Sequence, residues 1–471
     1  MRRVPEDNEF KDPVESQVLN VALTCLESPG VSRQAITERL LSGINTASTE
    51  DRSRTFKRRL ALAQEWGWVR REGSARSTVY YPTDEFRHVM AMRHIAKPTL
   101  MRPKVEYDFG LLNEYEPNRT FYLSEQQRAK LHARCRPGSF NAKDPAQAQM
   151  MRRFMTDLSH HSALLEGVRA NYIDTINLLE ENIQARHLSE EDAVILRNLY
   201  NAARVLVMAS GYPPDPRDFR VCETDICQIH ALVSDGLLKD RREQGRLRYA
   251  PVEIQYSQYV PPAIPDQIRA AFRLMVDKAS AIDDPYEQSF FLSAHLPYLQ
   301  PFSDCNKRTA RVACNIPLLN KGVLPISWRE VTPRDYHDAL LCLYEKQSFY
   351  GMTQIFTEAY LRSVERFDIE QRQRRPSRLE VTYAREIEQV IRRRVLDGDE
   401  LFRPSMPEEH WPYIKGYIES VLESAAENDM VLVPYRINYD QWCSWQERLA
   451  AAKAEEEAQN NESIDLHAQQ G

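Results

Sequence analysis

The sequence predicts a mainly helical protein with a small winged helix-turn-helix domain at its N-terminus. In most of the region 151–370, apolar residues recur at the spacing of amphipathic helices. Before that region, three shorter helical patterns are followed by two runs of strand-forming residues with a Gly73-Ser74 turn between them. The 471 residues are too many for one ordinary core, so two or three domains are expected.

The first 85 residues are expected to form the winged helix. Helices are predicted at about residues 14–27, 32–42 and 49–65, because Pro29-Gly30 and Gly43 interrupt the periodicity between them. A hairpin is predicted from the strand patterns on either side of the Gly73-Ser74 turn. In a helix-turn-helix of this layout, the third helix reads DNA.

Basic residues crowd the third helix and the hairpin. Between residues 52 and 76 there are eight Arg or Lys and two acids, although the whole chain has a net charge of −6. Such cations can pair with the phosphates of double-stranded DNA, which would make the affinity salt-dependent. The alternative is a protein-docking module whose charges are merely solvated. The candidate DNA-binding residues are Arg52, Arg54, Lys57, Arg58, Arg59, Arg70, Arg71 and Arg76.

The remaining chain divides by composition. Residues 86–150 are expected to be a partly irregular collar, because five prolines interrupt them. The main helical domain is predicted at residues 151–370, and a small helical module with a tail at 371–471. No apolar run reaches membrane-spanning length, no apolar leader is visible, and the eight cysteines are scattered. These features predict a cytoplasmic protein with free thiols and no membrane partner.

The stretch from Gln300 to Arg311 is the most informative. It places an acid, an amide and several cations before an apolar run, residues 312–319, that is predicted to be one helix. A helix N-terminus presents unpaired N–H groups and the positive end of a dipole. Asp304 can hold a hard cation, and Asn306, Lys307 and Arg308 can hold phosphate oxygens. We therefore expect a cradle for Mg²⁺ and a nucleoside triphosphate, with ATP as the expected nucleotide.

The same stretch resembles the signature of the Fic/Doc (Fido) family, H-x-F-x-[DE]-[GA]-N-[GK]-R-x-x-R. The residues that match are Phe302, Asp304, Asn306, Lys307, Arg308 and Arg311. Two positions depart from the pattern: Gln300 stands where the family has its catalytic histidine, and Cys305 where it has a small residue. The resemblance implies a helical Fic core in which Asp304 holds Mg²⁺ and the motif, Cys305 included, surrounds the nucleotide. It also implies transfer of part of that nucleotide to a hydroxyl side chain of a protein target.

An upstream segment, Ser162-Ala163-Leu164-Leu165-Glu166-Gly167, resembles the inhibitory motif [ST]-x-x-x-E-[GN] of many Fic proteins. The resemblance implies an ion pair between Glu166 and Arg311. That pair would occupy the cation that otherwise holds the γ-phosphate of the nucleotide.

A third segment, Gly245 to Arg248 followed by residues 252–254, resembles the G-x-x-R turn and the small β-hairpin flap of the family. Such a flap offers backbone groups to a target segment by strand addition. An ordinary hairpin would give the same pattern.

The identity of residue 300 governs the expected chemistry. General-base assistance is typically worth ~10²–10⁴ in rate, and an amide such as Gln300 does not titrate near neutral pH. His295 is expected to be a partly buried helix residue rather than a substitute base. Cys305 could be a thiol of lowered pKa or could simply pack in place of a small residue. Lys307 resembles the Doc-type variant associated with phosphoryl transfer, or is an exposed lysine without catalytic effect.

Three functions stay open. The first is a nucleotide-binding regulator with weak or no transferase activity, in which Glu166 gates the nucleotide and the winged helix binds DNA. The second is an active transferase that adenylylates (AMPylation) or phosphorylates a protein. The third is a non-catalytic interaction module in which the motifs are relics. The oligomeric state is also open, with a homodimer as one expectation.

Overall fold

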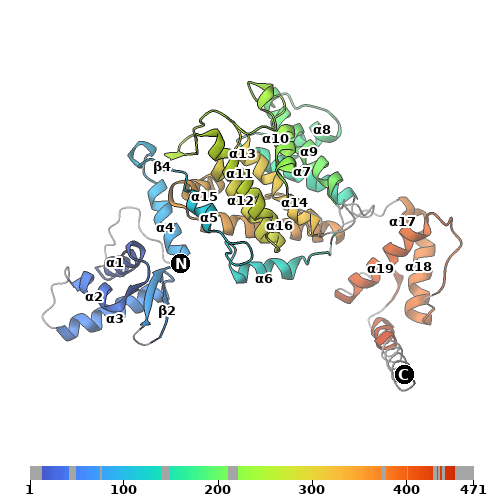
Figure 1. Cartoon of the computed structure of the whole chain (residues 1–471). Coiled ribbons are helices and arrows are strands. Elements are labelled where there is room, and N and C mark those ends of the chain that lie inside the picture. The colour runs from blue at the N-terminus through green and yellow to red at the C-terminus, as the bar shows by residue number, and fades with distance from the viewer. Residues whose placement is uncertain are drawn as a thin grey trace, which may run out of the picture. The chain divides into compact units, whose positions relative to one another are not determined.

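The structure, a computed structural model, describes residues 13–41, 49–74, 77–138, 140, 148–210, 221–372, 378–399, 401–427, 432, 435–437 and 441–450. The chain divides into two compact units, Met1–Asp368 and Ile369–Gly471. Each unit is mainly helical (Figure 1). In the described part of the chain, no helix is both long and apolar enough to cross a lipid bilayer.

In its described residues, the N-terminal part of the first unit contains three helices and a small sheet. Its elements are α1 (Pro13–Glu27), β1 (Val31–Ser32), α2 (Arg33–Leu41), α3 (Thr49–Glu65), β2 (Val69–Glu72) and β3 (Val79–Pro82). The three strands are antiparallel in the order β1-β3-β2. Val18, Val21 and Cys25 of α1 meet Phe56 of α3 in a core of their own. The predicted helices and hairpin are present; the two-residue strand β1 was not predicted.

The predicted collar is less irregular than expected. It contains α4 (Asp84–Ile95), a 3₁₀ turn (Thr99–Met101), β4 (Val105–Glu106), α5 (Phe109–Glu114) and α6 (Glu125–Arg134). Thr83 Oγ1 accepts a hydrogen bond from Phe86 N and caps α4, and Ser124 caps α6 in the same way. Phe86 belongs to the N-terminal core, so α4 is a continuous extension of that core rather than a separate linker.

A buried carboxylate joins α4 to the helical domain. Glu345 is fully buried on α15 (Pro333–Lys346). One of its oxygens accepts from Arg102 Nη1 and Ser257 Oγ, each at 2.8 Å, and the other lies 2.9 Å from His94 Nε2. His94 lies on α4, so this network links the N-terminal part to the domain that carries the signature.

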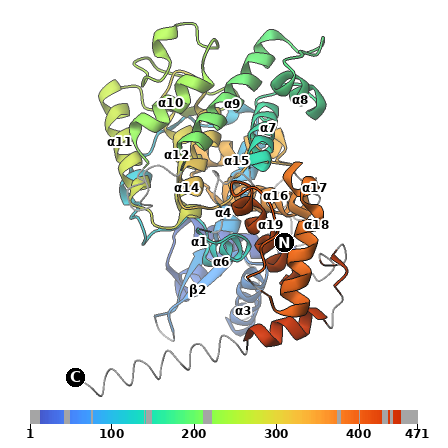
Figure 2. The same cartoon turned by 90° about the vertical axis from the view of Figure 1, so that its right-hand side faces the viewer.

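The main domain is built around one helix. Its helices, besides α15, are α7 (Ala148–Leu164), α8 (Tyr172–Glu180), α9 (Glu190–Ala209), α10 (Glu223–Val233), α11 (Pro265–Ser280), α12 (Pro285–Leu299), α13 (Asn306–Ala313), α14 (Asn315–Asn320) and α16 (Tyr350–Arg372). Every residue of α12 is buried, because other helices surround it; α11, α13 and α14 are among them (Figures 1 and 2). The signature loop begins where this central helix ends.

The apolar run 312–319 is two helices rather than the one that was predicted. Helix α13 starts at Asn306, inside the signature, and α14 starts at Asn315. Pro317 explains the break, because it has no N–H to donate to the carbonyl of Ala313. The start of α13 therefore brings its first-turn N–H groups into the signature itself.

The prediction of a β-hairpin flap is wrong. Residues 245–258 form turns and irregular backbone without a strand. The backbone N–H of Arg248 donates to the carbonyl of Pro301 at 3.0 Å, and Pro251 has no N–H to offer a ladder. The strand that does occur is β5 (Tyr259–Val260), which pairs in parallel with β4.

The second unit has its own core. Its helices are α17 (Arg378–Thr382), α18 (Ala384–Arg392) and α19 (Trp411–Glu427), with a π-helical turn at Arg393–Asp397. Ile387 and Val390 pack with Ile414 and Ile418. The single helix predicted at residues 379–396 is interrupted at Tyr383.

Candidate functional site

The loop that connects α12 to α13 carries two strained residues. Gln300 and Cys305 have φ angles of 51° and 59°, in the left-handed region that residues with a Cβ avoid. Such a conformation costs about 1–2 kcal/mol per residue, so it persists only where neighbours hold it. Asn306, Arg248 and His230 are neighbours that hold this loop through hydrogen bonds.

Asn306 folds the loop back on itself. Its Oδ1 accepts from Phe302 N at 2.9 Å, and its Nδ2 donates to Phe302 O at 2.9 Å and to Gln300 Oε1 at 2.8 Å. The side chain is buried, and both amide hydrogens are used. The sequence predicts a direct phosphate contact for Asn306; in this conformation it braces the loop instead.

A second brace comes from outside the signature. Arg248 is 2% exposed, and its Nε donates to the carbonyl of Gln300 at 2.7 Å. His230, on α10, stacks on Phe302 with ring centroids 3.8 Å apart. In the sequence, only a weak G-x-x-R pattern indicates Arg248 and nothing indicates His230, because both reach the loop through long-range packing.

Two guanidinium groups supply unsatisfied donors at the site. The Arg308 side chain is 10% exposed, and its Nε and Nη1 are buried without a hydrogen-bond partner among the described residues. Nη1 of Arg311, which is fully buried, is in the same state. Buried donors that lack partners are costly, typically by about 1–3 kcal/mol each. An anion that accepts from Arg308 and Arg311 would remove this cost.

Glu166, just beyond the end of α7, already occupies part of this cationic site. Its Oε1 lies 2.6 Å from Arg311 Nη2, so the ion pair implied by the inhibitory motif is present. Its Oε2 lies 3.2 Å from Lys307 Nζ, a second pair that was not predicted. Ser162 adds a hydrogen bond from Arg311 Nε to its Oγ at 2.8 Å. Gly167 follows with φ at 92°, a conformation that favours glycine.

The electrostatics of Glu166 favour its charged form. Burial alone would raise its pKa, but Arg311, Lys307 and Arg308 together lower the pKa to about 2. Arg311 is held further by Tyr336 of α15, whose ring centroid lies 5.2 Å from the guanidinium carbon. Sequence reasoning missed Tyr336. The carboxylate and the cations thus form a charged cluster at neutral pH.

The alternative chemistries raised for two other residues are not supported. Burial raises the pKa of the Cys305 thiol to about 12, so the hypothesis of a lowered thiol pKa is wrong and the side chain packs as a neutral group. His295 is a helix residue as predicted, but it is fully rather than partly buried in α12, and its Nε2 lies 2.9 Å from the hydroxyl of Tyr122. Burial lowers its pKa to about 3.

Asp304 is suited to share a metal ion with a bound phosphate. Its side chain is 68% exposed, and its Oδ1 accepts from Cys305 N at 2.6 Å. Among the described residues there is no group of three His, Cys, Asp or Glu side chains that could hold a metal by themselves. Mg²⁺ is commonly bound by one or two carboxylates with substrate phosphates and water. Asp304 therefore fits Mg²⁺ that arrives with a nucleotide.

The candidate DNA-binding cations lie in different environments. Arg54, Lys57 and Arg58 are exposed, and their spacing places them on one face of α3. The other described members have contacts within the unit: Arg59 with Gln17, Arg70 with Glu72 and the ring of Tyr81, and Arg71 with Thr78. The side chains of Arg52 and Arg76 lie outside the described residues.

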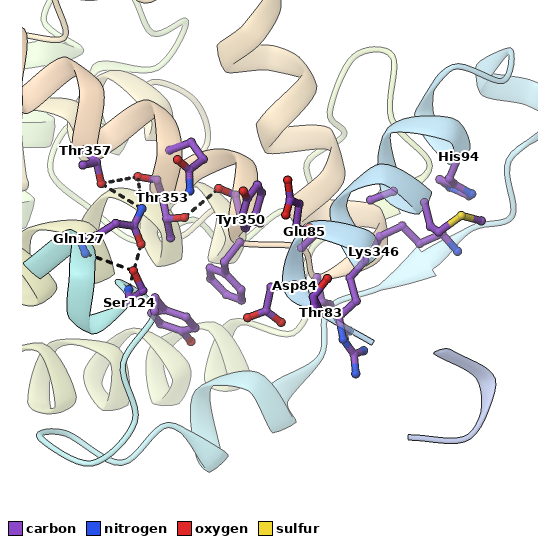
Figure 3. A pocket seen from close by; sticks show the side chains of 18 of the residues that line it. Thr83, Asp84, Glu85, His94, Ser124, Gln127, Lys346, Tyr350, Thr353 and Thr357 are labelled. Atoms are coloured by element: carbon purple, nitrogen blue, oxygen red, sulfur yellow. Dashed lines mark hydrogen bonds between the residues drawn. The ribbon is translucent and has the colours of Figure 1, made fainter. Parts of the chain in front are cut away.

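A groove of about 1840 Å³ lies between α4, α6 and the turn from α15 to α16. Figure 3 shows Gln127 reaching from α6 towards α16, where its Nε2 donates to Thr357 Oγ1 at 3.2 Å and to Thr353 O at 3.3 Å. Of the described residues that line the groove, none belongs to the signature. Because it lacks the signature residues, the groove is a weaker candidate than the cationic loop.

Comparison with known proteins finds a family match that includes the loop. Residues 220–318 match the model of the Fic/DOC family. The chain is 31% identical over 145 residues to Protein adenylyltransferase Fic of Nematostella vectensis, covering 30% of this chain and 32% of that protein. It is 24% identical over 198 residues to Protein adenylyltransferase fic-1 of Caenorhabditis elegans, covering 41% and 38%. The chain thus spans about a third of the length of these relatives. The solved structure of Fic-1 from C. elegans is similar with a TM-score of 0.44 and 16% identity, over 75% of this chain and 98% of that one.

Proposed function

We propose that this chain, which carries a Fic/DOC domain at residues 220–318, binds Mg²⁺ and ATP at the signature loop and has little or no transferase activity of its own. The observation that supports this most directly is the set of buried guanidinium nitrogens on Arg308 and Arg311 that lack acceptors among the described residues. Such planar, charged donors form strong hydrogen bonds with phosphate oxygens, as they do with carboxylates.

The cradle residues would take different parts of the nucleotide. Arg308 and the first-turn N–H groups of α13 would hold one phosphate, where the helix dipole also favours an anion. Arg311 would hold the terminal phosphate once Glu166 leaves it, and Lys307 would be freed by the same movement. Asp304 would hold Mg²⁺, which when bound neutralises phosphate charge. Asn306 would keep the loop in shape.

The contacts of Gln300 are the reason that we expect little or no transfer from the bound nucleotide. Its Oε1 accepts from Asn306, and its Nε2 donates to the carbonyl of Pro297 at 2.7 Å. An amide held in this way can orient a neighbour, but it cannot accept the proton of an attacking hydroxyl at neutral pH. Nucleotide binding and transfer are therefore separable in this chain.

Binding can be tested with the purified chain by calorimetry and thermal denaturation with ATP, with and without Mg²⁺. ATP should raise the melting temperature, and Arg308→Ala should weaken binding by about tenfold or more, because a hydrogen bond to a charged group is worth about 1.5–3 kcal/mol. Arg269→Ala is the matched control, since Arg269 is 69% exposed and pairs with Asp266 on the surface. Equal ATP binding in wild type and both variants would refute the proposal.

An active transferase is the second candidate, and the names of the two relatives favour it. A water held by Gln300, or a group of the target itself, would then have to accept the proton that the attacking hydroxyl loses. Incubation with α-labelled ATP beside γ-labelled ATP distinguishes adenylyl transfer, phosphoryl transfer and inert binding. Label on the chain or a protein target that is absent with Arg308→Ala would establish transfer.

A non-catalytic interaction module is the third candidate. It predicts that Mg²⁺ and ATP leave the melting temperature unchanged. A rise that needs Mg²⁺ and disappears in Asp304→Ala would exclude it.

We also propose that the three helices and sheet at residues 13–82 are a winged helix that binds double-stranded DNA, with nucleotide occupancy altering that binding. Exposed Arg54, Lys57 and Arg58 on one face of α3 support it. Removing one cation that pairs with a phosphate should reduce the slope of log affinity against log salt by about one. A variant with Arg54, Lys57 and Arg58 all replaced by Gln should thus reduce that slope by about three. An unchanged slope would favour a protein-docking role.

A further inference from the structure

His230 lies against the signature loop, and its two ring nitrogens have distinct partners. Its Nδ1 accepts from the backbone N–H of Gly245 at 3.0 Å. Its Nε2 lies 3.2 Å from the carbonyl oxygen of Asp304. Because a backbone N–H can only donate, Nδ1 must be unprotonated, so Nε2 carries the hydrogen and donates it to Asp304. The imidazole is therefore neutral and in a single tautomer.

The surroundings of the ring hold that state. His230 is fully buried and stacks almost parallel on Phe302, with an angle of 4° between the rings. Burial lowers the pKa of the imidazole to about 4. Gly245 has no room for a side chain, since an added Cβ would lie 2.9 Å from the carbonyl oxygen of Cys227. Gly245 therefore packs closely against α10, the helix that carries His230.

The bond to Asp304 controls one peptide plane. The carbonyl of Asp304 and the N–H of Cys305 belong to the same planar trans peptide, so they point in opposite directions. With the carbonyl held by His230, the N–H of Cys305 faces the other way and donates to Oδ1 of Asp304 at 2.6 Å. The orientation of the carboxylate thus depends on a bond made by a residue 74 positions earlier.

The hydrogen bond from His230 to the carbonyl of Asp304 opposes a rotation that the strained backbone of Cys305 favours. Rotation of the peptide between residues 304 and 305 would change φ of Cys305, which is now 59°. That rotation could relieve the left-handed conformation, which costs about 1–2 kcal/mol. The same rotation would turn the N–H of Cys305 away from the carboxylate of Asp304. The hydrogen bond from His230 opposes the rotation.

We infer that His230 is a positioning residue that sets the orientation of the Asp304 carboxylate and thereby the Mg²⁺ affinity of the nucleotide-bound loop. The inference rests on the proposed function for the metal and the nucleotide, but the positioning of the loop is independent of both. Outer partners that orient a metal ligand typically change metal affinity by about 10–100-fold when removed.

Two substitutions each keep one of the two hydrogen bonds that the ring of His230 makes. In His230→Gln the amide nitrogen can take the place of Nε2 and donate to Asp304, while the acceptor for Gly245 is lost. In His230→Asn the amide oxygen can take the place of Nδ1 and accept from Gly245, while the donor to Asp304 is lost. Both variants lose the stacked ring, so they form a matched pair. His230→Phe removes both bonds and keeps a ring on Phe302.

The readout is the Mg²⁺ concentration that gives half of the ATP-induced rise in melting temperature. It should increase about tenfold or more in His230→Asn and His230→Phe, and less than about threefold in His230→Gln. Binding of ATP without Mg²⁺ should be similar in all of them. Equal Mg²⁺ requirements in the Asn and Gln variants would overturn the inference, as would a loss of ATP binding that does not depend on the metal.

Hydrogen exchange of the ligand-free chain tests the same inference without a nucleotide. A peptide covering residues 303–306 should exchange faster in His230→Asn than in His230→Gln, because only the former frees the peptide that ends in the N–H of Cys305. Equal exchange would refute the role of His230. If wild type fails to bind Mg²⁺ and ATP, the proposed function fails, while this comparison still decides what His230 does.

Discussion

Replacing Glu166 by Gln separates the charge of this residue from its size. The carboxylate of Glu166 is 14% exposed and pairs with Arg311, which is fully buried, and with Lys307. The amide of Gln has nearly the same shape but no charge, so the substitution removes the attraction while keeping most of the packing. The ligand-free loop loses an anion, and the cationic site becomes available to a nucleotide.

The magnitude follows from the pKa of Glu166, which is lowered from the ordinary 4.5 to about 2. Each pKa unit corresponds to about 1.36 kcal/mol, so burial and the cations together favour the charged form over the neutral form by roughly 3 kcal/mol. Glu166→Gln should therefore lower the free energy of unfolding by about 3 kcal/mol without ligand. Since ATP no longer competes with the carboxylate, its affinity should rise by up to roughly a hundredfold.

The assay is titration calorimetry with ATP and Mg²⁺, together with denaturant unfolding. Glu116→Gln is the control, because Glu116 is 62% exposed and pairs with Arg119 on the surface, where an ion pair contributes about 0–1 kcal/mol. The two changes expected in Glu166→Gln have opposite signs: lower stability and tighter ATP binding. If ATP binds the variant no more tightly than wild type, Glu166 is not a competitor for the phosphate site, and the reasoning fails.

Three further outcomes are expected. Gln300→His should increase label transfer from ATP by ~10²–10⁴, measured on the chain and on candidate targets; no increase would mean that more than the base is missing. Because the folded pKa of Glu166 is depressed, its contribution to stability is complete above pH ~4.5 and is lost as the pH falls towards about 2, so the stability gap between wild type and Glu166→Gln should narrow over that window in acid denaturation. Glu345→Gln should cost about 3 kcal/mol or more in urea unfolding, since Arg102, 2% exposed at its side chain, would lose its anion; a cost below about 1 kcal/mol would contradict this.

Local sequence patterns predicted the helices whose ends are determined by nearby residues. The helices of the first 65 residues begin and end close to their predicted bounds, because proline, glycine and capping residues fix them. The pair between Glu166 and Arg311 was implied by resemblance to two motifs, and it is present although the residues are 145 positions apart. Neither partner alone would have indicated the other.

Features that depend on long-range packing were not predictable in this way. Asn306 has the composition of a phosphate ligand, but its position opposite Phe302 turns both of its amide hydrogens inward. The flap prediction assumed that strand-forming residues would find a strand, whereas Arg248 commits that backbone to the signature loop. His230 carried no signal at all, since a histidine in an apolar helical pattern is ordinarily a core residue.

The contacts of the loop separate two steps that a transferase must combine. Glu166 acts on the site through Arg311 and Lys307, and its removal changes how strongly an anion is held. Gln300 acts at the other end of the loop, and its replacement changes whether a proton can be accepted. Because the two residues share no hydrogen-bond partner among the described residues, their effects on ATP affinity and on transfer should be close to additive in a double variant. A double variant that transfers no better than Gln300→His at saturating ATP would agree with this separation, whereas strong synergy at saturation would show that Glu166 also shapes the chemical step.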